Sequence, residues 1–324
     1  MESLKTDADY LQWMSIASSS RRTYQQGQQA FAAFCNNIST QPYPLNEGTL
    51  RLFVTFIAHS LSFATIQTYL ASVRHRHIEL GFASNFNRMD SLRLLLRGVK
   101  RVKGSRVRQP RIPVTPLMLR QLKESLRQSQ YPEADKLMLW AAFTTAFFGF
   151  LRSSEFCSAS KHSFNPQTTL LVRNVTITGG IASIWIKVSK TDPFRQGQTI
   201  RIAASGSSIC PVRALQKHLQ NCTNEKQPLF TFQDKTFLTR QTLSGLVKQL
   251  LGTSELQGLS SHSFRIGAAT TAAAAKVPDW LIKTLGRWSS NCYEQYIRTP
   301  DNVIESIPSV LVNTVVRRSE FWQP

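Results

Sequence analysis

The chain has 324 residues, 42% of them hydrophobic, which is enough for two domains that each bury a core. Its formal net charge of +20 and its pI of about 10.3 favour a polyanionic partner, of which nucleic acid is the commonest. Five scattered cysteines without CxxC spacing argue against a disulfide framework or a zinc site and indicate an intracellular protein. The N-terminus lacks a signal-peptide pattern and no apolar run reaches the ~18–20 residues that span a bilayer, so we expect no membrane partner.

The positive charge is spread over both halves of the chain. Residues 1–111 contain 15 Lys/Arg and 6 Asp/Glu, and residues 112–324 contain 24 and 13. A single basic tail does not explain this distribution, whereas a protein that holds a polyanion with both domains does. A basic protein without such a partner is the alternative.

Residues 1–103 are predicted to form a nearly all-helical domain. Ser18–Ser20 is expected to cap one helix and Asn46 the next. Helical spacing turns these residues of the second and third helices inward: Leu50, Phe53, Val54, Ile57, Ile66, Leu70 and Val73. The other side of the third helix offers four candidate contacts to a DNA groove: Thr68, Ser72, His75 and Arg76.

A fourth helix, near residues 91–103, separates apolar from basic side chains. Leu95, Leu96 and Val99 lie on one side. The other side carries a basic ridge of Arg93, Arg97, Lys100 and Arg101. This ridge suits a track of phosphates, and a solvated face is the alternative. No acidic residue between positions 93 and 111 relieves the repulsion among the cations, which favours the phosphate track.

Residues 104–115 are interpreted as an extended linker between two domains. Prolines at positions 110, 113 and 116 exclude a long helix there. Arg106 and Arg108 keep the linker basic and are candidate DNA contacts, and the same run also fits a nuclear-import signal. A second domain is expected over residues 116–308. The apolar tail 309–324 either packs on its own domain or docks on a neighbouring subunit.

The second domain is predicted to combine helices with a few strands. Helices are expected at about 116–129, 132–148, 210–222, 239–251 and 262–275. Strands are expected at 170–178, 181–189 and 198–204, with Gly179-Gly180 turning between the first two. We therefore predict a mainly α protein with a small antiparallel sheet, an α+β fold in two domains that clamp DNA.

Several polar residues of the second domain stand out, although each alone has an ordinary explanation. Arg152 follows the apolar run 146–151, where an arginine usually pairs with an acid such as Glu155. His262 and Arg265 share a helical face, but HxxR spacing is common by chance. A lysine in a turn at position 190 and a helical tyrosine at position 296 are equally unremarkable singly.

The order of these residues along the chain is more informative than any one of them. Their sequence resembles that of the tyrosine recombinase (phage integrase) family over essentially the whole chain, in the positions Arg152, Lys190, His262, Arg265, Trp288 and Tyr296. The motifs that carry the resemblance are GFLRSSEF (149–156), KVSKTD (187–192), SHSFRIGAATTAA (261–273) and LGRWSSNCYEQYIR (285–298). Trp288 replaces the histidine of many members. The last two motifs are most similar to eukaryotic mobile-element recombinases of the DIRS and Crypton type.

The resemblance implies a site-specific DNA recombinase with a helical core-binding (SAM-like) domain followed by a catalytic domain. Arg152 and Arg265 would clamp the phosphate oxygens, where guanidinium forks stabilise the charge of the transition state, with Glu155 in support. Trp288 would donate its indole N–H to the phosphate and pack the site. No metal and no cofactor is expected, and the sequence has no carboxylate cluster of the kind that holds Mg²⁺.

The implied nucleophile is Tyr296, which would form a 3′-phosphotyrosyl intermediate. His262 would accept the phenol proton and Lys190 would protonate the leaving 5′-oxygen. Trp288 precedes Tyr296 by eight residues, one fewer than in many bacterial members, so Tyr293 is a rival nucleophile.

The family further implies double-stranded DNA as partner and a tetramer on two DNA duplexes. Integration or excision of a mobile element is the expected role, in the nucleus if the source is a eukaryote. Two alternatives stay open, a catalytically silent DNA-binding protein derived from a recombinase and a type IB topoisomerase.

Overall fold

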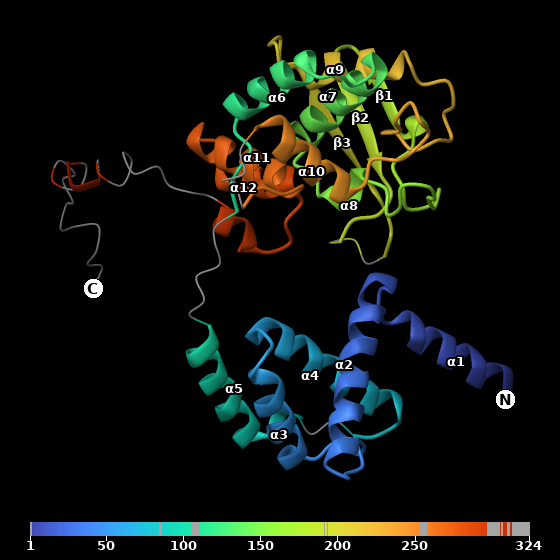
Figure 1. Cartoon of the computed structure of the whole chain (residues 1–324), viewed down its shortest axis with the longest axis vertical. Helices are drawn as coiled ribbons and strands as arrows, with labels where there is room; N and C mark the ends of the chain where they lie inside the picture. Colours follow the sequence, from blue (N-terminus) through green and yellow to red (C-terminus); the bar gives the residue numbers. More distant parts are fainter. Residues whose placement is uncertain are drawn as a thin grey trace, which may run out of the picture. The chain divides into compact units, whose positions relative to one another are not determined.

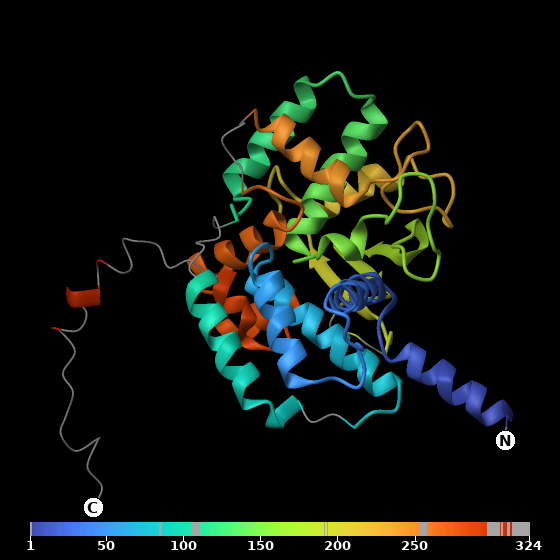
Figure 2. The ribbon, with the colours of Figure 1, turned by 60° about the horizontal axis from the view of Figure 1, so that its bottom comes forward.

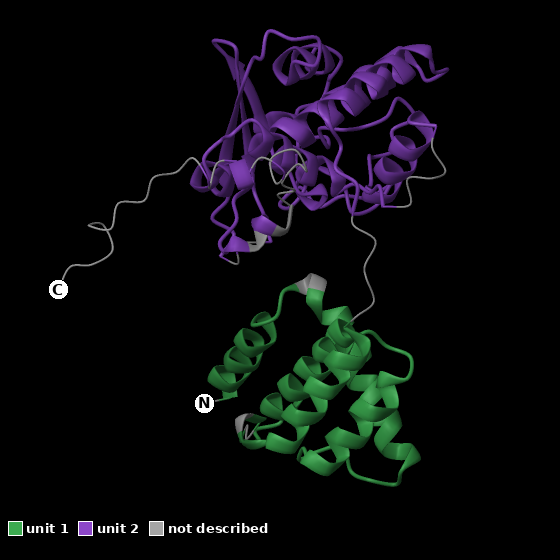
Figure 3. Cartoon of the chain, turned by 90° about the vertical axis from the view of Figure 1, so that its left-hand side faces the viewer, with its two compact units in different colours: residues 1–108 green, residues 109–324 purple. Residues whose placement is uncertain are grey.

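The computed structural model describes residues 2–83, 86–104, 111–190, 192, 194–252, 258–296, 305, 307–309 and 312. The chain forms two compact units, residues 1–108 and 109–324 (Figure 3). The division between them lies within the segment that the sequence analysis assigns to the linker. The predicted DNA contacts Arg106 and Arg108, and nearly all of the apolar tail 309–324, lie outside the described residues.

The first unit is wholly helical in its described part (Figure 1). It comprises α1 (Glu2–Met14), α2 (Ser18–Asn37), α3 (Glu47–Ala58), α4 (Phe63–Glu79), the 3₁₀ turn η1 (Phe86–Arg88) and α5 (Asp90–Lys103). Helices α2 to α5 enclose one core, whose buried side chains include Phe31, Phe53, Ile66, Val73 and Leu92.

Capping in this unit follows the prediction at one helix and departs from it at another. The Asn46 side chain accepts hydrogen bonds from the amides of Gly48 (2.8 Å) and Thr49 (3.2 Å), so it caps α3 as predicted. The predicted cap at Ser18–Ser20 is wrong, because α2 already begins at Ser18 and the preceding Ala17 has no side chain that could accept a hydrogen bond.

One candidate groove contact on α4 does not lie on the exposed side. Ser72 is fully buried, and its hydroxyl donates to the Tyr69 carbonyl at 2.7 Å. A Cβ added to Gly27 of α2 would lie 2.3 Å from the Ser72 oxygen, so α2 and α4 approach closely at this point. The prediction of Ser72 as a groove contact is therefore wrong, because packing against α2 buries a position that helical spacing places on the outside. Arg76 remains exposed, next to Glu79 at 3.4 Å.

Helix α5 has the two-sided character that its sequence indicates. Leu95, Leu96 and Val99 pack against the core of the unit. The cations Arg93, Arg97, Lys100 and Arg101 are all exposed. The basic ridge is thus available on the surface of this unit.

The second unit packs helices around a three-stranded antiparallel sheet of order β1-β2-β3. The strands are β1 (Val175–Thr178), β2 (Ile181–Ile186) and β3 (Gln198–Ala203). The helices are α6 (Pro116–Gln128), α7 (Glu133–Phe148), α8 (Ser153–Phe156), α9 (Pro211–Leu219), α10 (Arg240–Leu250), α11 (Ser263–Ala274) and α12 (Asp279–Gly286), with 3₁₀ turns η2 (Val172–Asn174) and η3 (Asn291–Tyr296). Figures 1 and 2 both show α11 and α12 side by side. The protein is thus mainly α with a small antiparallel sheet, as predicted.

Two of the predicted strands are longer than the observed strands by three residues or more. Residues 172–174 form η2, because the Asn174 side chain accepts from the Leu171 amide at 2.9 Å and closes a turn before β1. Strand β2 ends at Ile186, three residues early. The chain leaves the sheet there because Lys187 donates to the carbonyls of residues 166 and 169, at 2.6 and 3.3 Å.

The end of the predicted linker belongs structurally to the second unit. The amide of Ile112 donates to the Gly258 carbonyl (3.2 Å) and the amide of Val114 to the Ser263 carbonyl (3.0 Å) at the start of α11. Gly267 makes this approach feasible, because an added Cβ would lie 1.9 Å from the Val114 carbonyl oxygen. The small residues of α11 therefore serve close backbone packing.

Every helix within the described ranges is too short or too polar to cross a bilayer. Four cysteines with described side chains, Cys35, Cys157, Cys210 and Cys222, are free thiols.

We predict that Gly267→Ala lowers the free energy of unfolding by about 2–3 kcal/mol, because the new methyl group meets a backbone carbonyl that cannot rotate away. Urea unfolding followed by circular dichroism measures this change. Gly245→Ala in α10 is the matched control. No atom lies within 4 Å of its added Cβ, so helix propensity should leave the protein unchanged or stabilise it by up to ~1 kcal/mol. Equal losses in the two variants would contradict this account of α11.

Candidate active site

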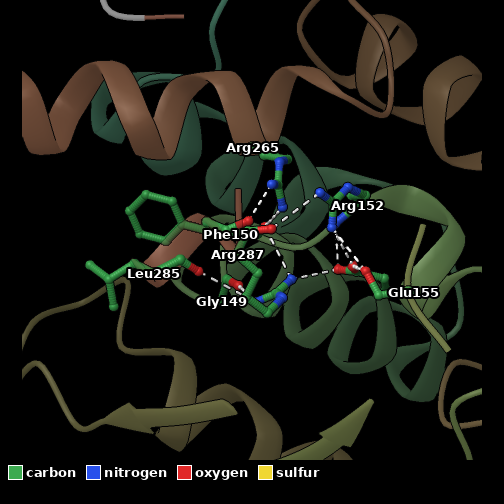
Figure 4. Close-up of polar contacts among 9 residues, drawn as sticks. Gly149, Phe150, Arg152, Glu155, Arg265, Leu285 and Arg287 are labelled. Atoms are coloured by element: carbon green, nitrogen blue, oxygen red, sulfur yellow. Dashed lines mark hydrogen bonds and ion pairs between the residues drawn. The ribbon is translucent and has the colours of Figure 1, made fainter. Parts of the chain in front are cut away.

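Arg152 lies directly before α8 and is held by the carboxylate three residues later (Figure 4). Its Nη1 donates to Glu155 Oε1 at 3.0 Å, and its own amide donates to Oε2 at 2.8 Å. The Glu155 side chain is completely buried, whereas that of Arg152 remains 14% exposed. The carboxylate therefore anchors an arginine whose guanidinium still reaches the surface of the site.

Ser189 joins this pair from the end of the sheet. Its hydroxyl donates to Glu155 Oε1 at 2.8 Å and accepts a hydrogen bond from Arg152 Nη1 at 2.9 Å. The early end of β2 thus brings a hydroxyl from the predicted lysine motif against the first arginine. Lys190, the next residue, is exposed.

Arg265 is the largest fully buried side chain among the described residues, with 1% of its surface exposed. Its Nη1 donates to the Phe150 carbonyl at 2.6 Å, and its Nη2 donates to the Gly286 carbonyl. The guanidinium carbon lies 4.1 Å from the centre of the Trp288 ring, a cation–π contact. Carbonyls and an aromatic face therefore solvate a charge that would otherwise be costly to bury.

His262 lies at the start of α11, half-buried, one turn before Arg265. Burial lowers its pKa to about 4, with further lowering by the charges of Arg111, Arg265 and Arg152. The imidazole is therefore neutral at pH 7 and able to accept a proton. A cavity of about 470 Å³ opens beside it, lined by Arg111, Ser153, Arg240, Gln241, Ser244, Ser260, Ser261 and His262. These residues include no carboxylate, which suits an anion.

Trp288 and Tyr293 pack together beyond α12. Both are buried, with 8% and 5% exposure, and their ring centres lie 5.8 Å apart. Tyr296 is the last residue of η3, and its side chain lies outside the described part of the chain.

Ser189 was not among the site residues predicted from the sequence, and neither was the last member of this cluster, Arg287. Its Nη2 donates to Glu155 Oε2 at 2.6 Å, so Glu155 is shared between two arginines (Figure 4). Burial alone would raise the pKa of Glu155. The Arg287 charge, the Arg152 amide, the Ser189 hydroxyl and the Arg152 charge together hold this pKa below its ordinary value. The sequence did contain a signal for Arg287. This residue is a second cation directly beside Trp288, and the motif 149–156 contains a single acid, Glu155.

The structure thus gathers Arg152, Glu155, His262, Arg265 and Trp288 in one unit. Hydrogen bonds join Arg152 to Glu155, and a cation–π contact joins Arg265 to Trp288. The pKa of His262 responds to both arginines. The candidate contacts on α4 and α5 belong to the other unit. The described residues contain no group of three His, Cys, Asp or Glu side chains that could hold a metal ion.

The chain is similar in sequence and in fold to known recombinases. It is 25% identical over 258 residues to the integrase/recombinase XerD homolog of Selenomonas ruminantium, covering 75% of this chain and 70% of that protein. No family model matches. The XerH site-specific recombinase in a post-cleavage complex with palindromic difH substrate has a TM-score of 0.62 at 17% identity, over 90% of this chain and 80% of that chain. The lambda integrase dimer on a COC′ core site has a TM-score of 0.55 at 13% identity, over 92% and 95%. The chain shares the fold of these proteins.

We predict that Glu155→Gln lowers the free energy of unfolding at pH 7 by about 3–5 kcal/mol, because it leaves the buried Arg287 and the partly exposed Arg152 without their counter-charge. The deficit should shrink in acid. Because the folded-state pKa is lowered, the contribution of Glu155 is complete above the pKa of an unfolded glutamate and is lost as the pH falls through the folded value.

Urea unfolding of the wild-type protein and of Glu155→Gln from pH 7 to pH 3 measures the difference in their free energies of unfolding. Glu124→Gln is the control, because Glu124 pairs with Arg127 on an exposed face and its loss should not register. A deficit that stays constant with pH would show that the ion pairs are not its cause.

Proposed function

We infer that the chain belongs to the tyrosine recombinase family, and we propose that it is a site-specific recombinase that cuts and rejoins DNA. The observation that carries the proposal is the convergence of Arg152 and Arg265, distant in sequence, beside a neutral imidazole. Arg265 is bonded to Phe150, two residues before Arg152, and both charges act on His262. The sequence similarity to a recombinase and the shared fold support the same function.

The two arginines suit attack on a phosphodiester. A phosphodiester repels nucleophiles through its own charge, and its transition state carries more charge than its ground state. Preorganised donors at the non-bridging oxygens therefore lower the barrier, each by on the order of 3–4 kcal/mol. We assign this role to Arg152, whose guanidinium is partly exposed, and to Arg265, which is buried against Trp288. To reach a phosphate, the Nη atoms of Arg265 would have to exchange the Phe150 and Gly286 carbonyls for phosphate oxygens.

Tyr296 is the proposed nucleophile, which attacks phosphorus to give a 3′-phosphotyrosyl bond and releases the 5′-oxygen. The burial of Tyr293 against Trp288 supports this choice over its rival, because a core tyrosine cannot approach DNA without unpacking. The low pKa of His262 keeps its imidazole unprotonated at pH 7, so the ring is available as the proposed acceptor of the phenol proton. Lys190, exposed in the turn after β2, protonates the leaving oxygen.

We further propose double-stranded DNA as the partner, held also by the exposed cations of α5 and by Arg106 and Arg108. A tetramer on two duplexes, integration or excision of a mobile element, kinship with DIRS and Crypton recombinases and a nuclear site of action belong to the same proposal. Their support is the resemblance of the two C-terminal motifs.

Two other functions are alternatives to this proposal. A silent DNA-binding protein would bind without forming an adduct, but the intact arginine and histidine cluster speaks against it. A type IB topoisomerase would relax supercoiled plasmid without a specific site. Strand exchange between two duplexes that carry the site, without relaxation of plasmid that lacks it, separates the recombinase from both.

We predict that the full chain forms a covalent adduct with a nicked suicide duplex and that Tyr296→Phe abolishes the adduct. The duplex carries a site first selected from random-sequence DNA by binding to the protein, and denaturing electrophoresis detects the adduct. Loss of the phenol oxygen removes the nucleophile, whereas DNA binding should change less than about threefold.

Tyr293→Phe is the matched control, since it removes the same atom from a tyrosine packed in the core. It should retain most of the cleavage activity. An adduct that persists in Tyr296→Phe and disappears in Tyr293→Phe would reassign the nucleophile.

A further inference from the structure

Arg287 occupies a backbone position that normally suits glycine. It ends α12 with φ 53° and ψ 46°, in the left-handed region. A side chain is less favourable in this region than in the right-handed form, because Cβ comes too close to the following carbonyl oxygen, and helix ends of this kind usually carry glycine or asparagine. At Arg287 the hydrogen bonds of the side chain offset this cost.

The left-handed turn points the Arg287 side chain into the site, where only 5% of it remains exposed (Figure 4). Its Nη2 donates to Glu155 Oε2 at 2.6 Å, and its Nη1 donates to the Gly149 carbonyl at 3.2 Å. A longer contact of 3.5 Å reaches the Phe150 carbonyl, which also accepts a hydrogen bond from Arg265. One guanidinium therefore joins the end of α12 to the turn that precedes Arg152.

Arg287 also changes the charge that Glu155 presents to Arg152. Glu155 Oε2 is bonded to Arg287 and to the Arg152 amide, while Oε1 is bonded to Arg152 Nη1 and Ser189. With both arginines the trio carries a net charge of +1. Without Arg287 the buried carboxylate would neutralise Arg152, the group assigned to the phosphate.

The backbone of the same turn links both clamping arginines to the tyrosine segment. The Gly286 carbonyl accepts a hydrogen bond from Arg265 Nη2, and the Arg287 carbonyl accepts one from Arg152 Nη2 at 3.5 Å. Trp288 and η3 follow at once. The position of residues 286 and 287 therefore sets where the nucleophile segment begins relative to the two arginines.

We propose that Arg287 is a positioning residue for cleavage. Arg287 shares Glu155 with Arg152, so that the carboxylate does not cancel the charge that Arg152 presents to the phosphate. It also fixes the start of the segment that carries the nucleophile. This inference rests on the proposed recombinase function.

The test replaces Arg287 by glycine, which suits the left-handed backbone and so separates the side chain from the turn. Single-turnover cleavage of the selected nicked duplex at saturating protein should fall by roughly 100-fold, with Kd for the duplex changed less than about threefold. Arg287→Lys, which keeps the charge but not the planar fork, should recover about tenfold. Lys276→Gly is the control. Lys276 is also a cation with positive φ (57°) at a helix end, but it is exposed, so cleavage should not change.

A second substitution tests whether Arg287 acts through Glu155. Glu155→Gln added to Arg287→Gly removes the unbalanced carboxylate and should restore about tenfold of the lost rate. The cleavage deficit of Arg287→Gly should also shrink as the pH falls, because protonated Glu155 no longer cancels the charge of Arg152. A merely structural cap would show neither effect.

The outcomes separate the two proposals. Wild-type cleavage with Arg287→Gly as active as wild type would overturn the positioning role and leave the recombinase standing. A loss that is confined to DNA binding, or that is insensitive to Glu155→Gln and to pH, would also overturn the role. Absence of any adduct with the wild-type protein would overturn the proposed function, and the positioning role with it.

Discussion

One buried carboxylate organises the site. Glu155 is bonded to two guanidinium groups, a backbone amide and a hydroxyl, which come from the start of α8, the end of α12 and the loop after β2. A charge in this position would be unfavourable with any single partner, because burial strips its water away. The full set of donors reverses that balance, so the three segments are stable only when they meet at this oxygen pair. The arrangement of the arginines is a consequence of this requirement.

Local chemistry explains why much of the fold could be predicted. Asn46 caps α3 and the apolar stripe of that helix is buried, because capping and helical spacing involve residues a few positions apart. The bounds of α6, α7, α10 and α11 fall within one residue of those expected, for the same reason. Ser72 was predicted to be exposed but is buried, because Gly27 of α2 packs against it. The residues near Ser72 in the sequence do not indicate this close approach of α2.

The site shows the same division. Motif order identified Arg152, Glu155, His262 and Arg265, and the structure brings these four residues into one unit. The roles assigned to them, and to Lys190 and Tyr296, stay predictions. Arg287 was not predicted, because its contacts depend on a left-handed turn and on an acid far away in sequence. An arginine in the sequence does not indicate a left-handed turn. Ser189 was not predicted as a site residue, because it was assigned to the strand 181–189, whereas β2 ends at Ile186.

The contact between Gly286 and Trp288 has a consequence for how this site can change over generations. A methyl group on residue 286 would lie 1.6 Å from the Trp288 ring, so no larger residue fits while the indole is present. Replacement of the tryptophan by a smaller side chain would relieve that restriction, but the reverse order of substitution is blocked. The two positions therefore have a one-way mutational route, in which the aromatic residue changes first and the glycine becomes variable only afterwards.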